Sequence, residues 1–417
     1  MVNVIKIAWR NLFRYKRRTI LTGSLISIGV ILMVVFSGIG RTFTGQVIGL
    51  LTNANIGDLQ IHSAGYIESI DSMPLDITIG EEGLHQVEEI LKANNMIKAY
   101  SKRIRFGGMI SNFQRSVSVR FTAVLPEMEA GTCPDLPKRI LNRTSDNPQF
   151  IKPGEILIPE NIAAALHFKI GSDAVLVATN KDGSVNGMNF KIGGISENLM
   201  GPTGRDAYLH FEDAKELLRI EGDEITEIAV KLNDFNQVDS IYNKLLIALG
   251  EIEDDKGQSR PFEVHTWAQL TPFQSMANIV NLLIIMIRIV LIAIVLISVM
   301  NVIIMSVYER ISEIGTIASI GTPPGRILSL FLVEGISLAL ASSLVGSVVS
   351  IGILLYLRLT TFRFKMGMLD LTLAPNIPFK DVLATILLVV IVAAISGFHP
   401  AWKASRLEPV DALRYNS

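Results

Sequence analysis

Residues 308–321 read YERISEIGTIASIG and join two apolar runs that are each long enough to cross a membrane. Their apolar members recur at helical spacing, namely Ile311, Ile314, Ile317 and Ala318. Their polar members fall on the remaining faces, namely Glu309, Arg310, Glu313 and Ser319. This pattern predicts one amphipathic helix that lies at the membrane surface.

Both ends of this stretch carry termination signals. Gly321 stands where the C-terminal cap of a helix is expected. Thr322 before Pro323 and Pro324 is typical of the cap and first turn of a new helix. We therefore expect a linker, residues 308–325, whose helix is held between two fixed ends and is available to contact another protein.

The composition is that of a membrane protein. The 417 residues have a mean hydropathy of +0.41, 49% are apolar and only 18% are charged, and the apolar residues are clustered. The net charge is -1 and the basic residues stand next to apolar runs, which argues against nucleic acid as a partner. The single cysteine, Cys133, cannot form an internal disulfide, and we expect an inert thiol.

Four apolar runs predict four transmembrane helices. They cover residues 20–40, 279–307, 327–357 and 382–398. Basic residues without an acidic one precede the first run, which places the amino terminus in the cytoplasm. A cleaved signal peptide is the alternative for the first run, but that run is about 20 residues long and lacks a small-x-small cleavage site.

An even number of spans returns the carboxyl terminus to the cytoplasm. Lys403, Arg406 and Arg414 agree with this side of the membrane. The connection 358–380 must then face outward, although it carries basic residues. The stronger charge signal at the amino terminus decides the orientation.

Basic and aromatic residues mark the expected membrane boundaries. The pattern of residues 1–18 predicts an interfacial helix on anionic lipid. The predicted interface residues are Trp9, Arg10, Arg14, Arg17, Arg18 and Arg288. Arg288 lies about 20 residues before the linker, so we expect it at the outer boundary, with the helix continuing outward as a stalk. The alternative is a costly arginine inside the helix bundle.

The third run carries small residues at spacings of three or four, a pattern that allows close helix packing in lipid. They are Gly335, Ala339, Ser343, Gly346 and Ser350. The alternative is that small residues are simply tolerated in membrane helices. Glu334 precedes this stripe and should face protein or the interface. Because it is a lone carboxyl, packing or pairing is favoured over a proton-relay role.

Residues 57–270 have the composition of a soluble domain that is long enough to bury its own core. Residues 117–123 alternate as a strand does, and residues 174–178 and 188–192 predict a hairpin. Helical patterns occur at 84–93, 161–166, 213–218 and 238–249. The expected class is α+β, with a division into two lobes near the proline-rich stretch 126–153.

The sequence has no catalytic or phosphate-binding motif. H-E-x-x-H, G-x-S-x-G and G-x-x-x-x-G-K-[ST] are all absent. The histidines are scattered: His62, His85, His167, His210, His265 and His399. We therefore expect no catalytic residue, no metal ligand and no cofactor on this chain.

Three separated segments resemble the FtsX-like permeases of the MacB and lipoprotein-releasing (Lol-type) ABC superfamily. They are IAWRNL (7–12) with RRT (17–19), then ER (309–310) with EIG (313–315) and Gly321, and finally PAWKASRLEPVDALR (400–414). The layout of one span, a large domain and three spans is also similar. Ala318 and Ser319 depart from an Arg-Ala pair that is frequent in the family, which leaves open the fit to a particular ATPase.

The resemblance implies a mechanism and partners. In this family the linker is a coupling helix that seats on a separate ABC ATPase dimer, which binds ATP and Mg, and stalks carry movement to the outer domains. A second permease copy or paralogue and membrane lipid are the other expected partners. The implied coupling residues are Glu309, Arg310, Glu313, Ile314, Gly315, Ser319 and Gly321.

The expected fold is an α-helical membrane protein with four transmembrane helices, a large α+β extracytoplasmic domain between the first and second, helical stalks and a cytoplasmic coupling helix. The expected segments are an amphipathic helix (1–18), the first span and stalk (19–56), the outer domain (57–270), a stalk and second span (271–307), the coupling helix (308–325), the third span (326–357), an outer loop (358–380), the fourth span (381–399) and a cytoplasmic tail (400–417).

The leading functional hypothesis is release of lipoproteins from a bacterial inner membrane to a periplasmic carrier, with the large domain in the periplasm. One alternative is efflux of peptides or small amphiphiles by the same machinery. The other alternative is FtsX-like signalling to cell-wall hydrolases.

Overall fold

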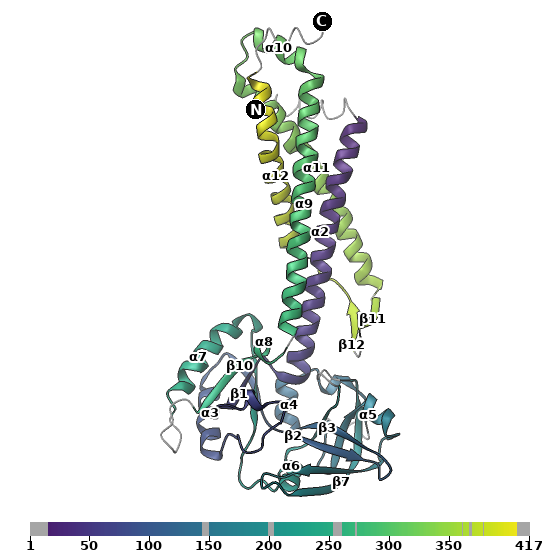
Figure 1. The fold of residues 1–417 in the computed structure, drawn as a ribbon, viewed down its shortest axis with the longest axis vertical. Helices are drawn as coiled ribbons and strands as arrows, with labels where there is room; N and C mark the ends of the chain where they lie inside the picture. The colour runs from purple at the N-terminus through teal and green to yellow at the C-terminus, as the bar shows by residue number, and fades with distance from the viewer. Residues whose placement is uncertain are drawn as a thin grey trace. The chain divides into compact units, whose positions relative to one another are not determined.

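The computed structural model describes residues 16–143, 150–198, 204–252, 261–271, 273–360, 362–366, 369–377 and 379–406. The chain divides into two compact units (Figure 1). The helical unit comprises the described parts of Met1–Gly45, Met276–Phe364 and Leu371–Ser417, and the sheet unit those of Gln46–Ser275 and Lys365–Asp370. Each unit has its own cluster of buried apolar side chains.

The helices of the helical unit are labelled in Figure 1. They are α2 (Lys16–Leu51), α9 (Phe273–Glu309), α10 (Ile311–Ser319), α11 (Pro324–Thr360) and α12 (Phe379–Ser405). Among the described residues, four of them, all except α10, are long and apolar enough to cross a membrane, in agreement with the sequence. The four share one apolar core, which includes Val30 of α2, Val299 of α9, Phe331 of α11 and Val389 of α12.

Helix α12 continues beyond the expected end of the fourth span at residue 399. It ends at Ser405, with Pro400 inside the helix. Ala401 and Ala404 are buried in the shared core, so packing offsets the backbone hydrogen bond that proline cannot make. Residues 407–417 of the expected tail lie outside the described residues.

The linker forms α10 between two breaks in the helical backbone. Arg310, with φ −122°, interrupts the run from α9 into α10. At the other end Gly321 has φ +91°. The Gly321 N–H donates to the Ala318 carbonyl at 3.0 Å and the Thr322 N–H to the Ile317 carbonyl at 3.3 Å. These two bonds form a Schellman cap, for which glycine has the required backbone freedom. Gly321 ends the helix as the sequence predicted.

The small residues of α11 lie in its buried face, and all five members of the expected stripe are buried. A Cβ added at Gly346 would lie 2.8 Å from the Ser27 carbonyl oxygen of α2. A Cβ added at Gly335 would lie 2.8 Å from Ile303 Cδ1 of α9. The missing side chains therefore allow α2 and α9 to approach α11 closely.

We predict that Gly346→Ala destabilises the helical unit by about 1–3 kcal/mol, because the added methyl overlaps the α2 backbone. Gly352→Ala is the matched control on the same helix, since a Cβ there meets nothing within 4 Å. Thermal unfolding of the full chain in detergent measures both variants. Equal unfolding midpoints would contradict a tight contact at Gly346.

In the described part of the sheet unit, ten strands form one sheet in the order β10-β1-β9-β2-β3-β8-β5-β7-β4, with β6 paired to β2 and β7. The strands are β1 (Leu59–Ser63), β2 (Ile97–Ser111), β3 (Ser116–Val124), β4 (Ile140–Arg143), β5 (Glu155–Pro159), β6 (Asp173–Thr179), β7 (Val185–Ser196), β8 (Asp206–His210), β9 (Glu227–Leu232) and β10 (Phe262–Thr266). The helices are α3 (Glu81–Ala93), α4 (Pro126–Thr132), α5 (Glu160–Ala165), α6 (Phe211–Leu218), α7 (Val238–Gly250) and α8 (Trp267–Leu270). A separate pair, β11 (Phe362–Met366) and β12 (Leu369–Leu373), lies within the expected outer loop.

The expected α+β class agrees with this architecture. The predicted strand lies in β3, and the predicted hairpin is the β6-β7 pair, in which Ala174 lies opposite Phe190. The four helical patterns correspond to α3, α5, α6 and α7. The expected division at 126–153 is wrong, because strands that follow this stretch pair with strands that precede it. Strand β9 joins β1 and β2, and β8 joins β3.

The chain enters and leaves the sheet unit through neighbouring strands. A π-helix, Thr52–Ile56, leads from the end of α2 into β1. Strand β1 pairs antiparallel with β10, so that Leu59 lies opposite Thr266. The strand that follows the π-helix and the strand that precedes α8 are therefore joined directly by a ladder of hydrogen bonds.

Candidate functional site

Charged and hydroxyl side chains from three long helices meet where α9 gives way to α10. We call this group the linker cluster; it comprises Arg18 of α2, Ser306 and Glu309 of α9, Arg310, and Glu334 of α11. Arg18 Nη1 lies 2.7 Å from Glu309 Oε2, and Arg18 Nη2 donates to Ser306 Oγ at 2.7 Å. Arg18 thereby ties the start of α2 to the end of α9.

The other half of the linker cluster is buried. Glu334 is 1% exposed and Arg310 is 5% exposed. Ser306 Oγ donates to Glu334 Oε1 at 3.1 Å, and Arg310 Nη1 lies 3.6 Å from Glu334 Oε2. A carboxylate in apolar surroundings is stable only when it is paired and hydrogen-bonded. The pairing role expected for Glu334 therefore agrees with its contacts.

Helix α10 presents one face to the helical unit and leaves the other exposed. Ile314 and Gly315 are buried, and Ile314 belongs to the shared core. The exposed residues are Glu313, Thr316, Ile317, Ser319, Ile320 and Gly321. The expected coupling residues thus fall into two groups: an exposed surface, and a root that contacts the other helices. Their contact with an ATPase stays a prediction.

The structure describes three of the six expected interface residues. Those outside the described residues are Trp9, Arg10 and Arg14. Arg17 is exposed. Arg18 binds Glu309 and Ser306, and the Glu309 carboxylate 2.7 Å away offers it a charge-assisted hydrogen bond. Its position at the membrane interface stays a prediction. Arg288 is half-buried on α9, and its Nε has no hydrogen-bond partner in the described part of the chain.

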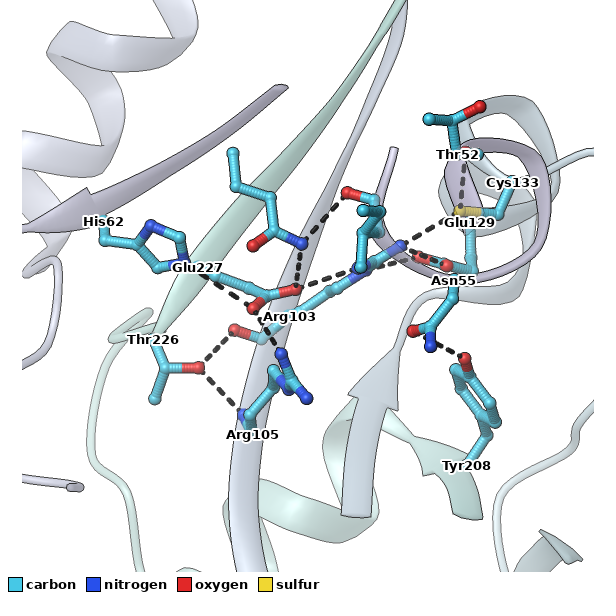
Figure 2. A network of polar contacts seen from close by, with 12 residues as sticks. Thr52, Asn55, His62, Arg103, Arg105, Glu129, Cys133, Tyr208, Thr226 and Glu227 are labelled. Carbon is cyan, nitrogen blue, oxygen red and sulfur yellow. Dashed lines mark hydrogen bonds and ion pairs between the residues drawn. The ribbon is translucent and has the colours of Figure 1, made fainter. Parts of the chain in front are cut away.

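A second group of buried charges lies in the sheet unit, and we call it the stalk-root network (Figure 2). Arg103 of β2 binds the carboxylate of Glu129 on α4 through Nε at 3.0 Å and Nη2 at 2.6 Å. Its Nη1 donates to Glu227 Oε1 of β9 at 2.8 Å. The other oxygen of Glu227 lies 3.3 Å from Arg105 Nη1 and 3.7 Å from His62 Nε2. The carboxylates of Glu129 and Glu227 are fully buried.

The stalk-root network continues into the π-helix that follows α2 (Figure 2). Arg103 Nη2 donates to Cys133 Sγ at 3.2 Å, and Cys133 Sγ donates to the Thr52 carbonyl at 4.0 Å. Gln60 Nε2 donates to the Ile56 carbonyl at 2.9 Å. Carbonyl groups at the end of a helix lack intrahelical donors. Here buried side chains donate the hydrogen bonds to these carbonyl groups.

Further contacts hold the same turn through Asn53. Lys231 Nζ donates to Asn53 Oδ1 at 2.6 Å and to Asp58 Oδ1 at 2.7 Å. The Asp135 N–H donates to the Asn53 carbonyl at 2.9 Å. The second oxygen of Asp58, which is buried, accepts the Leu232 N–H at 2.9 Å. The π-helix that follows α2 is therefore bound to β9 and to the segment that follows α4.

Burial and ion pairing move the pKa values of this network in opposite directions. Burial, together with the charge of Glu129, raises the pKa of the Cys133 thiol, which agrees with an inert cysteine. Burial also raises the pKa of Tyr66 to about 12. Burial acts against the ionised form of Glu227, but the charge of Arg105 and the other donors outweigh this effect and lower the pKa of Glu227. Glu227 is a carboxylate at neutral pH.

Sequence reasoning missed most of these partners. The Arg103 contacts join residues 26 and 124 positions apart, and Arg18 and Glu309 are 291 positions apart. Glu334 was visible as a carboxyl within an apolar run, but nothing local distinguished Ser306 from other small polar residues of membrane helices. Among the described residues, no group of three or more His, Cys, Asp or Glu side chains is placed to hold a metal ion.

Two protein families match this chain. The family described as FtsX-like permease C-terminal matches residues 285–409. The family described as MacB-like periplasmic core domain matches residues 19–246, which is more than half of the chain.

Individual proteins match this chain at low sequence identity. The lipoprotein-releasing system transmembrane protein LolC of Xylella fastidiosa is 24% identical over 288 residues, which are 64% of this chain and 66% of that protein. The macrolide export ATP-binding/permease protein MacB of Syntrophobacter fumaroxidans is 28% identical over 173 residues, 40% of this chain and 23% of that protein. The chain thus spans less than two thirds of the length of either relative. The crystal structure of the periplasmic region of MacB from Actinobacillus actinomycetemcomitans aligns with a TM-score of 0.36 and 12% identity, over 56% of this chain and 96% of that one.

We predict that Glu334→Ala destabilises the helical unit by about 3–5 kcal/mol, because it removes the buried carboxylate that lies 3.6 Å from Arg310 Nη1. The double variant Arg310→Met, Glu334→Leu removes both charges and should recover most of that loss. Thermal unfolding of the full chain in detergent compares the three proteins. If Glu334→Ala were as stable as the unmodified chain, the pair would not hold these helices together.

The stability of the sheet unit should depend on pH through Glu227. Because its folded-state pKa is lowered, its ionisation contributes stability that is present above the unfolded pKa of about 4.3 and is lost as the pH falls from there toward the folded pKa. We predict that Glu227→Gln is less stable at pH 7 and loses less stability on acidification.

Fluorescence of the buried Trp267 reports unfolding of the sheet unit in the full chain, with Trp9→Phe and Trp402→Phe removing the other two signals. Glu89→Gln, an exposed carboxyl on α3, is the control and should keep the original pH dependence. Identical pH profiles for Glu227→Gln and Glu89→Gln would rule out the stabilising role of the Glu227 carboxylate.

Proposed function

We propose that this chain, which belongs to the family of FtsX- and MacB-type ABC transporter permeases, converts ATP hydrolysis by a separate ATPase into movement of its sheet unit. ATP and Mg are bound by the ATPase dimer in this proposal. Two permease chains, either identical or paralogous, work with that dimer. The chain lies in a bacterial inner membrane, with the sheet unit in the periplasm.

One observation carries the proposal: α10 is a short helix with two fixed ends and an exposed face. Its last turn is closed by the Gly321 cap. Its first residue follows Arg310, which is paired to Glu334 of α11, and the preceding Glu309 is paired to Arg18 of α2. A force applied to the exposed face therefore reaches α2, α9 and α11 through short polar contacts rather than through a flexible loop.

The far end of α2 suits the same role. The π-helix that follows α2 is bound by the stalk-root network through side chains of β1, β9 and the segment after α4. Buried ion pairs resist partial separation, because an exposed half-pair would leave a charge without a partner in apolar surroundings. We infer that the π-helix moves together with the sheet to which it is bound.

Release of lipoproteins from the inner membrane to a periplasmic carrier is the cargo reaction that we favour. The support is the LolC relative, whose match extends over 64% of this chain. Efflux of a peptide or small amphiphile is the second candidate, and the MacB relative supports it. Purification of the chain with its ATPase, followed by identification of co-purified acylated proteins or amphiphiles, separates the two.

We predict that Glu313→Lys lowers ATP turnover of the reconstituted permease and ATPase by about tenfold or more, because reversal of an exposed interface charge disfavours docking. Glu89→Lys makes the same change on the sheet unit and should leave turnover unchanged. Membrane insertion of both variants is checked by fractionation. Normal turnover of inserted Glu313→Lys would contradict α10 as the ATPase contact.

A further inference from the structure

A cavity of about 210 Å³ opens between the end of α9, the start of α10 and the end of α12. Its wall is apolar, with Ile304 and Val307 from α9 and Ile311 from α10. Its polar groups come from Tyr308, His399 and Lys403. The cavity therefore combines an apolar wall with hydrogen-bond donors, as a pocket for an amphiphile does.

Lys403 supplies a basic group to this cavity. Among the described residues, no acidic side chain lines the cavity, and Lys403 is exposed on the last turns of α12. Arg406 lies three residues further on the same helix, with its guanidinium 4.5 Å from the centre of the Trp402 ring. Of the two described carboxylates within two positions of a lining residue, Glu309 is bound to Arg18 and Glu313 is exposed on α10. Lys403, His399 and Arg406 recur at helical spacing, so an anion at the cavity mouth meets donors along one side of α12.

Exposed aromatic side chains near the cavity are of the kind found at a membrane interface. Tyr308 is 55% exposed and Trp402 is 41% exposed, and each stands at the end of a helix that is apolar enough to span a bilayer. Exposed tyrosine and tryptophan at such positions are typical of the belt at the level of the lipid headgroups. The apolar wall then faces the upper acyl chains, and the basic groups face the phosphates.

We propose that this cavity binds an anionic phospholipid, with its phosphate on Lys403 and His399 and the start of its acyl chains against Ile304, Val307 and Ile311. The apolar wall favours a lipid over a free phosphate, and the excess of basic groups favours an anionic lipid over a zwitterionic one. Because Ile311 is the first residue of α10, the bound lipid packs against the root of the linker helix. The proposal does not depend on the transported cargo or on the ATPase.

Native mass spectrometry of the full chain in uncharged detergent tests this. Phosphatidylglycerol and phosphatidylcholine with the same acyl chains are added at matched concentrations. The unmodified chain should retain phosphatidylglycerol preferentially, and Lys403→Ala should weaken its binding about fivefold. Lys403→Arg keeps the charge and should keep the preference. Lys380→Ala is the matched control, since Lys380 is exposed at the opposite end of α12.

Three results would overturn the proposal. The first is equal retention of the two lipids by the unmodified chain, or an unchanged preference in Lys403→Ala. The second is displacement of phosphatidylglycerol by glycerol 3-phosphate at equal concentration, which would make this a site for free phosphate. The third is loss of ATPase binding by Lys403→Ala without any change in lipid retention, which would show that the cavity binds the ATPase and not lipid.

Discussion

A charged side chain that leaves water must meet a partner, and the position of the linker helix depends on this requirement. The carboxylate of Glu334 lies among apolar helices, where Arg310 and Ser306 approach it. An uncompensated charge there would cost several kcal/mol. The pairing therefore joins α9, Arg310 and α11 at this point. The same contacts involve Arg310, the residue between the end of α9 at Glu309 and the start of α10 at Ile311.

The buried charges of the sheet unit are also paired, and they form a larger group of side chains. Two arginines, Arg103 and Arg105, and two carboxylates, Glu129 and Glu227, balance one another in its interior. Replacing such a group by apolar side chains is often harmless to stability, whereas removing one member is not. Its value here is therefore positional: it fixes the π-helix after α2 against the sheet.

Membrane lipid and ATPase would act on neighbouring parts of one helix in this scheme. The exposed face of α10 carries Glu313, and its first residue, Ile311, forms part of the wall of the cavity beside Lys403. A molecule bound in that cavity would limit how far the start of α10 can shift, because closely packed atoms can hardly be compressed. Close packing of α11 on α2 at Gly346 limits movement in the same way. The helical unit is thus constrained to move as packed helices rather than as independent ones.

The sequence by itself determined the features that depend on local physics: the four apolar helices from their hydropathy, the Gly321 cap from backbone freedom, and the β6-β7 hairpin from alternation and turn residues. Only the tertiary structure decided which charges meet. Arg18 meets Glu309 across 291 positions of the chain, and the proline-rich stretch 126–153 does not divide the sheet unit. The physical reason is that hydrophobic periodicity depends on residues close together in the sequence. An ion pair here depends on two side chains far apart in the chain, and only the packing of the helices and strands brings them together.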